Sequence, residues 1–271
     1  MTGGRRFYKM SGSGNDFVIF DSRDGDANEL REPRHIRQLC DRRQGIGADG
    51  VVIVQPSARA DVLMKYFNSD GSVGAMCGNA ALCVTRLAVQ LGLASPAAMT
   101  LETDDGVLQS RLVSDRPEID LAPVRGIREV AEGSPEAGER RLGYAVAGVP
   151  HIVVLCDEVA GVDVGARGSA LRRAAWAGPE GANVNFVSQE GSQWAMRTFE
   201  RGVEAETLAC GTGAVATATL LKTWGLTGAH TALRTRSGCI LEVGLRDAEG
   251  RVLPRLRGEG RVVFEGFLGE V

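Results

Sequence analysis

The sequence contains few residues that bind metal ions. Its 271 residues include three histidines and six cysteines, and no Cys-x-x-Cys pair occurs among them. Structural zinc sites use four Cys or His ligands at short, characteristic spacings. We therefore expect no metal site in this protein.

The sequence also lacks an excess of charge and a long apolar run near its start. The formal net charge is −3, which favours neither nucleic acid nor an anionic membrane as a partner. No run after Met1 is long enough for a signal peptide or a membrane span. We expect a cytoplasmic protein whose cysteines are reduced thiols rather than a disulfide framework.

A phosphate-binding loop is missing as well. The glycine-rich tract Gly45-Ile46-Gly47-Ala48-Asp49-Gly50 leads into the apolar run Val51–Val54, which predicts a buried strand. No Gly-Lys-Ser or Gly-Lys-Thr follows, and no helix pattern opens after the glycines. Nucleotide binding is therefore not predicted for this tract.

What the sequence does contain is an internal repeat. The tract that begins at Cys77 and ends at Gly92 matches the tract that begins at Cys210 and ends at Gly225, because 210 − 77 = 133 and 225 − 92 = 133. A chain of this length has room for about two domains. The stretch from Pro123 to Arg141, which contains Gly, Pro and Glu, is the expected junction. The predicted halves are residues 1–122 and 123–257.

The segments that follow the two cysteines predict helices with almost no polar face. In the second of them, Lys222 is the only charged residue. A helix that is apolar on all sides has to be enclosed, and the surrounding segments read mostly as strands. We expect an α+β fold in which each half is a bent, mostly antiparallel sheet wrapped around its own central helix. Gly92 and Gly225 are the expected left-handed residues at the helix ends.

Smaller elements are predicted by the same patterns. Pro33–Cys40 has the apolar spacing of a short amphipathic helix, and a second helix is expected over about Ser169 to Trp176. The alternating or apolar runs predict strands over residues 7–10, 17–20, 62–66, 100–102, 107–113, 118–121, 144–147, 152–155 and 194–199.

A cysteine at the start of a helix has a particular chemistry. The unpaired N–H groups of the first turn and the positive end of the helix dipole lower the pKa of a thiol there. The same N–H groups can hold a carboxylate. For this chain the donors would be the backbone N–H groups of Gly78, Asn79, Gly211 and Thr212.

Two such thiols in duplicated halves predict a reaction. If they meet one substrate from opposite sides, one thiolate removes a proton and the opposite thiol returns one to the other face. That is racemisation or epimerisation of an α-amino acid or a similar carbon acid without pyridoxal phosphate, and the helix ends would stabilise the reacting carboxylate. A lone cysteine in an Ala-rich helix is more often a core residue, and Cys40, Cys83, Cys156 and Cys239 keep that interpretation.

Three further residues are candidates from their positions. His151 stands in what reads as a turn before a buried strand, which modestly favours a site over the core. Glu200 and Arg201 lead toward the second cysteine helix, although most such pairs are solvated.

The motifs together resemble those of the diaminopimelate epimerase family over essentially the whole chain. They are Ser11–Phe17, Gly45–Asp49, Phe67–Gly71, Cys77–Asn79, Asn183–Phe186, Glu200–Gly202 and Ala209–Gly213. The resemblance implies interconversion of LL- and meso-2,6-diaminopimelate in lysine and peptidoglycan biosynthesis, with no cofactor. It also implies two pseudo-symmetric domains, with the last strand, around 261–268 within 258–271, returning to the first domain. A homodimer is common in the family.

The same resemblance assigns residues to roles. It makes Cys77 and Cys210 the acid and base thiols, and Gly78, Asn79, Gly211 and Thr212 the donors to the reacting carboxylate. It implies that the substrate's amino groups and distal end are held by Asn15, Asn68, Asn183, Glu200 and Arg201, and that His151 and Glu200 tune the thiols. Three positions depart from the family pattern. Ala80 stands where the family usually has glycine, Gly50 where some members carry a glutamine, and Val149 where many members carry an asparagine.

Two alternatives remain open from the sequence. One is a related enzyme, either a cofactor-free racemase or epimerase that acts on another amino acid or an isomerase or dehydratase on the same scaffold. The other is a non-catalytic amino-acid-binding protein, although binding alone would not need both cysteines.

Overall fold

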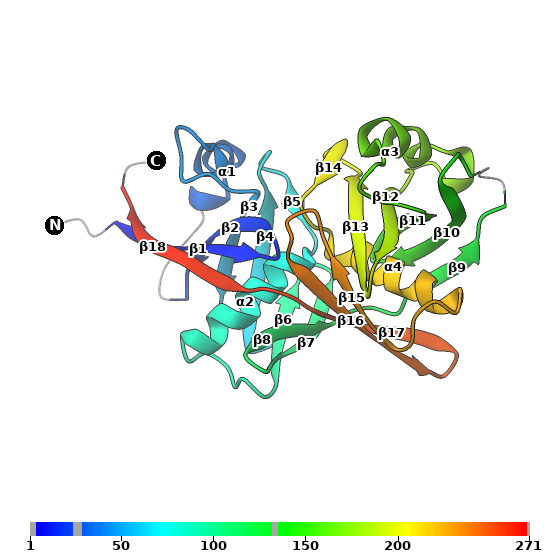
Figure 1. Ribbon diagram of the computed structural model, residues 1–271. Helices are drawn as coiled ribbons and strands as arrows, with labels where there is room; N and C mark the ends of the chain where they lie inside the picture. Colours follow the sequence, from blue (N-terminus) through cyan, green and yellow to red (C-terminus); the bar gives the residue numbers. More distant parts are fainter. Residues whose placement is uncertain (1–3, 24–28, 132–134, 270–271) are drawn as a thin grey trace. The chain divides into compact units, whose positions relative to one another are not determined.

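The computed structural model describes residues 4–23, 29–131 and 135–269. The chain forms two compact units, one of residues 1–119 with 258–271 and one of residues 120–257. Figure 1 gives the element labels along the chain.

The described residues of the first unit form a mixed sheet with two α-helices and one 3-10 helix. Its strands follow the spatial order β18-β1-β2-β3-β4-β6-β7-β8, with β5 added to β4. The pairs β2–β3 and β4–β6 are parallel, and the others are antiparallel. The elements are β1 (Arg5–Gly12), β2 (Asn15–Asp21), the 3-10 helix η1 (Glu29–Arg31), α1 (Pro33–Cys40), β3 (Gly50–Gln55), β4 (Val62–Asn68), β5 (Val73–Gly74), α2 (Gly78–Gln90), β6 (Met99–Thr103), β7 (Gly106–Val113), β8 (Arg116–Asp120) and β18 (Arg261–Leu268).

The second unit repeats this arrangement. Its spatial order is β9-β10-β11-β12-β13-β15-β16-β17, with β14 added to β13, and its parallel pairs are β11–β12 and β13–β15. The elements are β9 (Arg125–Glu129), β10 (Glu139–Ala147), β11 (Val149–Cys156), α3 (Val164–Arg172), the 3-10 helix η2 (Ala175–Ala177), β12 (Asn183–Glu190), β13 (Gln193–Glu200), β14 (Ala205–Thr207), α4 (Gly211–Thr223), β15 (His230–Arg234), β16 (Ile240–Ala248) and β17 (Arg251–Arg257).

The structural repeat follows the sequence repeat. Helices α2 and α4 both have 13 residues and begin 133 residues apart, because 211 − 78 = 133. Each is preceded by a strand pair that is parallel, β2–β3 or β11–β12, and each is followed by a strand that pairs in parallel with an earlier one. The two halves therefore share one topology.

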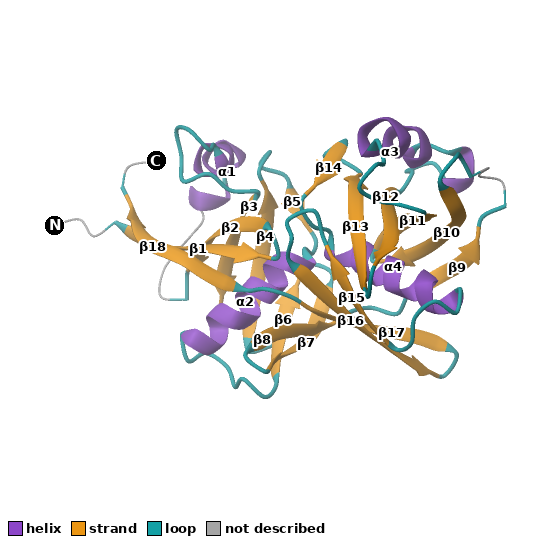
Figure 2. Cartoon of the chain, in the orientation of Figure 1, coloured by secondary structure: helices purple, strands orange, loops and turns teal. Residues whose placement is uncertain are grey.

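Both cysteine helices are enclosed, as their apolar composition requires. Ten of the 13 residues of α2 and ten of those of α4 are buried. Helix α2 packs on β1, β4, β6, β7 and β18, and α4 packs on β10, β11, β12, β15, β16 and β17. Figure 2 shows each helix running among the strands of its own unit. The expected fold class is confirmed: the sheet of each unit is mostly antiparallel, with two parallel pairs.

Left-handed glycines end both helices, as expected. Gly92 has φ 68° and Gly225 has φ 75°. The next residue donates back to the last turn in each case, from Leu93 N–H to the Ala88 carbonyl and from Leu226 N–H to the Leu221 carbonyl, both at 2.9 Å. This pattern satisfies carbonyl groups that a helix end leaves open.

Two local expectations differ from the structure. The helix expected over 169–176 begins earlier, at Val164, because the Asp163 carboxylate caps it by accepting from the Ala166 N–H at 3.0 Å. The stretch expected as a junction, 123–141, contains β9 and the first residues of β10. The compact units divide between residues 119 and 120 instead.

No helix among the described residues is long and apolar enough to cross a membrane.

Helix α3 offers a matched pair of substitutions for its packing on β13. A Cβ at Gly168 would lie 2.4 Å from the Cβ of Phe199, whereas a Cβ at Gly165 would meet only the Asp163 side chain at 3.5 Å. Gly168→Ala should lower the free energy of unfolding by about 1–3 kcal/mol through overpacking. Gly165→Ala should leave it unchanged or raise it by up to about 1 kcal/mol. Urea unfolding of both variants measures this, and equal effects at the two positions would contradict the packing described here.

Candidate active site

Cys77 immediately precedes helix α2. Its backbone is extended, with φ −133° and ψ 119°, and its carbonyl accepts the first helical hydrogen bond, from the Ala81 N–H at 2.9 Å. The side chain is half-buried. Cys77 thus stands at the end of the helix where backbone N–H groups lack helical partners.

Cys210 occupies the same place before α4. Its φ of −134° and ψ of 110° nearly repeat those of Cys77. The Gly213 N–H donates to the Cys210 Sγ at 3.4 Å, and Thr212 Oγ1 lies 3.6 Å from the same sulfur. Hydrogen bonds of this kind stabilise negative charge on the acceptor. The two cysteines that the sequence singled out therefore share one backbone setting.

Three other cysteines have environments that suit the core. Burial raises the pKa of Cys83 well above its ordinary value, that of Cys40 to about 11 and that of Cys156 to about 12. A thiol that stays protonated in this way is a poor base. Among the described residues, no group of three or more His, Cys, Asp or Glu side chains is arranged to hold a metal ion.

In the first unit the structure joins two of the predicted substrate-binding residues. Asn79, in the first turn of α2, donates through Nδ2 to Asn15 Oδ1 at 2.7 Å. Asn15, at the start of β2, donates through its own Nδ2 to Asp49 Oδ2 at 2.9 Å. Asn68 lies at the end of β4, where its amide donates to Ser72 Oγ at 3.0 Å.

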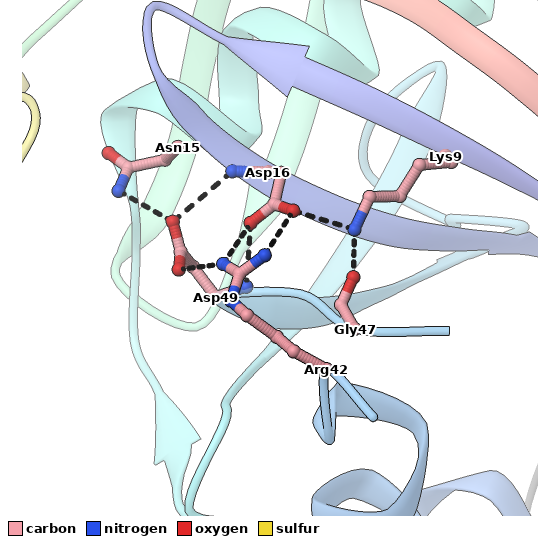
Figure 3. A network of polar contacts seen from close by, with 6 residues as sticks. All are labelled: Lys9, Asn15, Asp16, Arg42, Gly47 and Asp49. Atoms are coloured by element: carbon pink, nitrogen blue, oxygen red, sulfur yellow. Dashed lines mark hydrogen bonds and ion pairs between the residues drawn. The ribbon is translucent and has the colours of Figure 1, made fainter. Parts of the chain in front are cut away.

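Asp49 is part of a charged cluster that the sequence analysis did not identify (Figure 3). Arg42 binds both oxygens of Asp16, at 3.0 and 2.7 Å, and Asp49 Oδ1 at 2.8 Å. Buried Lys9 pairs with Asp16 at 2.7 Å and donates to the Gly47 carbonyl. Burial raises the pKa of Asp16, but hydrogen bonds from Arg42 and Lys9 outweigh it and hold this pKa at about 2. Asp16 lies in the motif Ser11–Phe17 and Asp49 in the motif Gly45–Asp49. Membership of these motifs was the only signal in the sequence that could have pointed to them.

In the second unit His151 lies inside β11 rather than in a turn, so that expectation was wrong. Its side chain is fully buried. Burial, together with the nearby positive charge of Arg201, lowers the pKa of His151 to about 3. His151 is therefore neutral at physiological pH.

Asn185 is a second residue that sequence reasoning missed. Its Nδ2 lies 3.1 Å from the Ile152 carbonyl, to which it donates, and 3.2 Å from His151 Nδ1. Its Oδ1 accepts from Thr198 Oγ1 at 3.0 Å. A Cβ at Gly213 would lie 2.3 Å from that oxygen, so the first turn of α4 needs glycine there. Asn185 thus packs between His151 and the second cysteine helix.

The predicted residues Asn183 and Arg201 are also brought together. The Arg201 N–H donates to Asn183 Oδ1 at 2.7 Å. The Arg201 guanidinium pairs with Glu180 at 3.0 Å, but the Glu180 side chain is 78% exposed, so that pair is weak. Glu200 is the last residue of β13.

The three positions that differ from the family pattern are explained in part. Gly50 has no room for a side chain, since a Cβ would lie 2.6 Å from the Phe67 carbonyl oxygen and 2.7 Å from the Tyr66 ring. Ala80 is fully buried, and Val149 is half-buried at the start of β11.

Solved structures show the same fold. A PhzF-family phenazine biosynthesis protein from Bacillus anthracis superposes with a TM-score of 0.76 at 17% identity, covering 100% of both chains. A probable proline racemase from Agrobacterium radiobacter gives a TM-score of 0.68 at 18% identity, covering 98% of this chain and 93% of that one. At these identities the likeness extends to the fold alone.

Sequence relatives are more specific. A family model described as diaminopimelate epimerase matches residues 7–125 and 143–253. The diaminopimelate epimerase of Gemmatimonas aurantiaca is 50% identical, with 96% of this chain and 98% of the relative covered. That of Archaeoglobus fulgidus is 38% identical, with 97% and 95% covered. Together with the paired Cys-Gly helix starts, these matches show that the chain belongs to the diaminopimelate epimerase family.

Proposed function

We propose that this member of the family interconverts LL- and meso-2,6-diaminopimelate by a two-base mechanism that uses Cys77 and Cys210. One thiolate takes the α-proton, and the electron pair of the broken C–H bond moves toward the carboxylate. The other thiol donates a proton to the opposite face of the carbon, which inverts it. Protons balance over the cycle, and no oxidant or electron-accepting cofactor is required.

The observation that carries this proposal is the matched setting of the two cysteines. Each is the residue before a buried 13-residue helix, each precedes glycine, and their backbone angles agree within about ten degrees. The N–H groups of Gly78, Asn79, Gly211 and Thr212 are the proposed donors to the reacting carboxylate. Such donors stabilise charge as it develops in the transition state.

The other end of the substrate needs recognition of its own. We assign this to Asn68, Asn183 and Arg201. An arginine can bind a carboxylate through two parallel hydrogen bonds, which fixes direction as well as charge. The exposed partner Glu180 can be displaced at small cost, and Val149 adds no polar group.

His151 and Glu200 are proposed to act on the thiols rather than on the substrate alone. Because His151 is neutral and fully buried, it would act as a polar neighbour and not as a permanent positive charge.

Several further properties are part of the same proposal. The two compact units would be the two duplicated domains, with 258–271 returning to the first. The enzyme would work in the cytoplasm as a homodimer without a cofactor, in lysine and peptidoglycan biosynthesis.

Substitution of either cysteine tests the thiol pair. Cys77→Ala and Cys210→Ala should each lower kcat/KM for diaminopimelate by about 100-fold or more, the scale of losing a general acid or base. Cys83→Ala, which removes a buried thiol from the helix that Cys77 precedes, is the control and should stay active. An active Cys77→Ala variant beside an inactive but folded Cys83→Ala variant would reject the assignment.

Substitution of Arg201 tests which amino acid the enzyme acts on. Arg201→Met should raise the transition-state free energy with diaminopimelate by about 2 kcal/mol or more, the cost of removing one partner of a buried charge pair. Arg173→Met, which removes a 70% exposed arginine of the same unit, should have no effect. The measurement is kcat/KM for diaminopimelate and for lysine in all three proteins. A preference of the unmodified protein for lysine, or a harmless Arg201→Met, would favour a racemase of another amino acid.

His151 makes stability depend on pH. Its folded pKa of about 3 lies below the ordinary value of 6.5, so the unfolded chain binds this proton more readily. The stabilisation is therefore full above pH 6.5 and is lost as the pH falls toward 3, by on the order of 1 kcal/mol per pH unit. Urea unfolding across this range should show a shallower slope for His151→Gln than for the unmodified protein. His230→Gln, which removes an exposed histidine, should keep the original slope; an unchanged slope in His151→Gln would refute the expectation.

A further inference from the structure

Three side chains link the charged cluster to the start of helix α2. Asn79 Nδ2 donates to Asn15 Oδ1 at 2.7 Å, and Asn15 Nδ2 donates to Asp49 Oδ2 at 2.9 Å. Asn79 follows Cys77 by two residues and is 2% exposed. We call Asp49, Asn15 and Asn79 the amide relay.

The charge at one end decides the direction of every bond in the amide relay. An ionised carboxylate can only accept hydrogen bonds, so it requires the NH2 group of Asn15 to face it. The carbonyl oxygen of Asn15 then faces Asn79 and requires the NH2 group of Asn79. What remains is Asn79 Oδ1, a buried acceptor without a hydrogen-bond partner in the part of the chain that the structure describes.

The carboxylate of Asp49 is itself held in place. Arg42 donates to its Oδ1 at 2.8 Å, and the Asp16 N–H donates to its Oδ2 at 3.2 Å. The same guanidinium binds both oxygens of Asp16, and Figure 3 shows these groups converging on Asp49 from β2 and from the segment after α1. Asp49 is thus a fixed acceptor rather than a mobile surface charge.

Among the residues of the second unit that the structure describes, there is no equivalent of the amide relay. By the repeat, Thr212 stands for Asn79 and Ala182 for Asp49, because 212 − 79 = 133 and 182 − 49 = 133. Val149 stands for Asn15 with an offset of 149 − 15 = 134, since each is the first residue of its strand and follows a left-handed glycine, Gly148 with φ 70° and Gly14 with φ 111°. The strand register agrees on Ala182, because Gly50 pairs with Phe17 and Asn183 pairs with His151. Helix α4 nevertheless begins with the same backbone geometry as α2. Forming such a helix start therefore does not require the relay.

We propose that Asp49 is a positioning residue for the reaction, which orients the amides of Asn15 and Asn79 so that Asn79 Oδ1 accepts a hydrogen bond from an ammonium group of the amino-acid substrate. An unpaired buried acceptor is costly, and an ammonium has donors and no acceptor. The reversed relay would present an NH2 group, which cannot bind an ammonium. This inference rests on the function proposed above.

A double-mutant cycle tests whether Asp49 acts through Asn15. Asp49→Asn keeps the shape of the side chain. Because a carboxamide can both donate and accept, it no longer fixes which end of the Asn15 amide faces it. It should lower kcat/KM for diaminopimelate by roughly 10-fold to 100-fold, the range for losing one hydrogen bond to a charged group. In an Asn15→Ala background the same substitution should cost less than about threefold, because coupled residues are not additive.

A purely structural role gives the opposite result. If Asp49 only braces the fold through Arg42 and Asp16, its substitution costs the same factor with and without Asn15, and additivity would overturn the proposal. An Asp49→Asn variant with full activity would also overturn it. Should Asp49→Asn fail to unfold cooperatively, Arg42→Met takes its place in the cycle, and additivity with Asn15→Ala would overturn the proposal in the same way.

Asp115 provides the control in the same unit. Arg86 binds both of its oxygens, much as Arg42 binds Asp16, but Asp115 lies in the exposed turn between β7 and β8. Asp115→Asn should leave kcat/KM unchanged both in the otherwise unmodified protein and in the Asn15→Ala variant. The Cys77→Ala variant distinguishes a failure of the proposed function from a failure of the inference about Asp49. If it is active, the proposed function fails; if it is inactive and the Asp49 cycle is additive, only the inference about Asp49 fails.

Discussion

An α-helix that is apolar on every side must be removed from water, and each unit of this protein is built around one. Helices α2 and α4 expose almost none of their surface because strands of their own unit surround them. The requirement sets the position of the residue before each helix, since a helix held on all sides cannot shift its first turn. The two cysteines inherit their matched backbone geometry from this packing.

Close packing around the first turn of each helix is achieved in two different ways. At the first helix, Gly12 lets β1 approach so closely that a Cβ would lie 2.6 Å from the Asn79 carbonyl oxygen. Asn79 is then tied to Asn15 and to the charged cluster of Asp49, Arg42, Asp16 and Lys9. At the second helix, Gly213 lets the Asn185 amide approach, and that amide is tied to neutral, buried His151. The backbone is duplicated, whereas the side chains that hold each helix start have diverged.

This divergence affects the electrostatics near each thiol. The first helix start lies at the end of a hydrogen-bonded chain that begins at an ion cluster, in which Asp16 keeps its charge down to about pH 2. The second has a histidine whose burial keeps it uncharged. The two thiols would therefore work beside different polar groups although they share one backbone geometry. A reaction in which each thiol meets a different face of the substrate is compatible with such a difference.

Elements whose cause is local or periodic could be predicted from the amino-acid sequence. The 133-residue repeat, the enclosed cysteine helices, the glycines that end them and most strands follow from apolar patterning and from glycine's access to positive φ. The start of α3 was misplaced although Asp163 offered a capping signal, and His151 was assigned to a turn because its burial in β11 depends on neighbouring strands.

The amide relay could not be derived in advance. Asn15, Asp49 and Asn79 are separated by about 30 residues at each step, and only the parallel pairing of β2 with β3 and the packing of α2 on β1 bring them within hydrogen-bond distance. Such contacts depend on how strands that are distant in the sequence align with one another. That alignment cannot be read from the residue types or from their spacing.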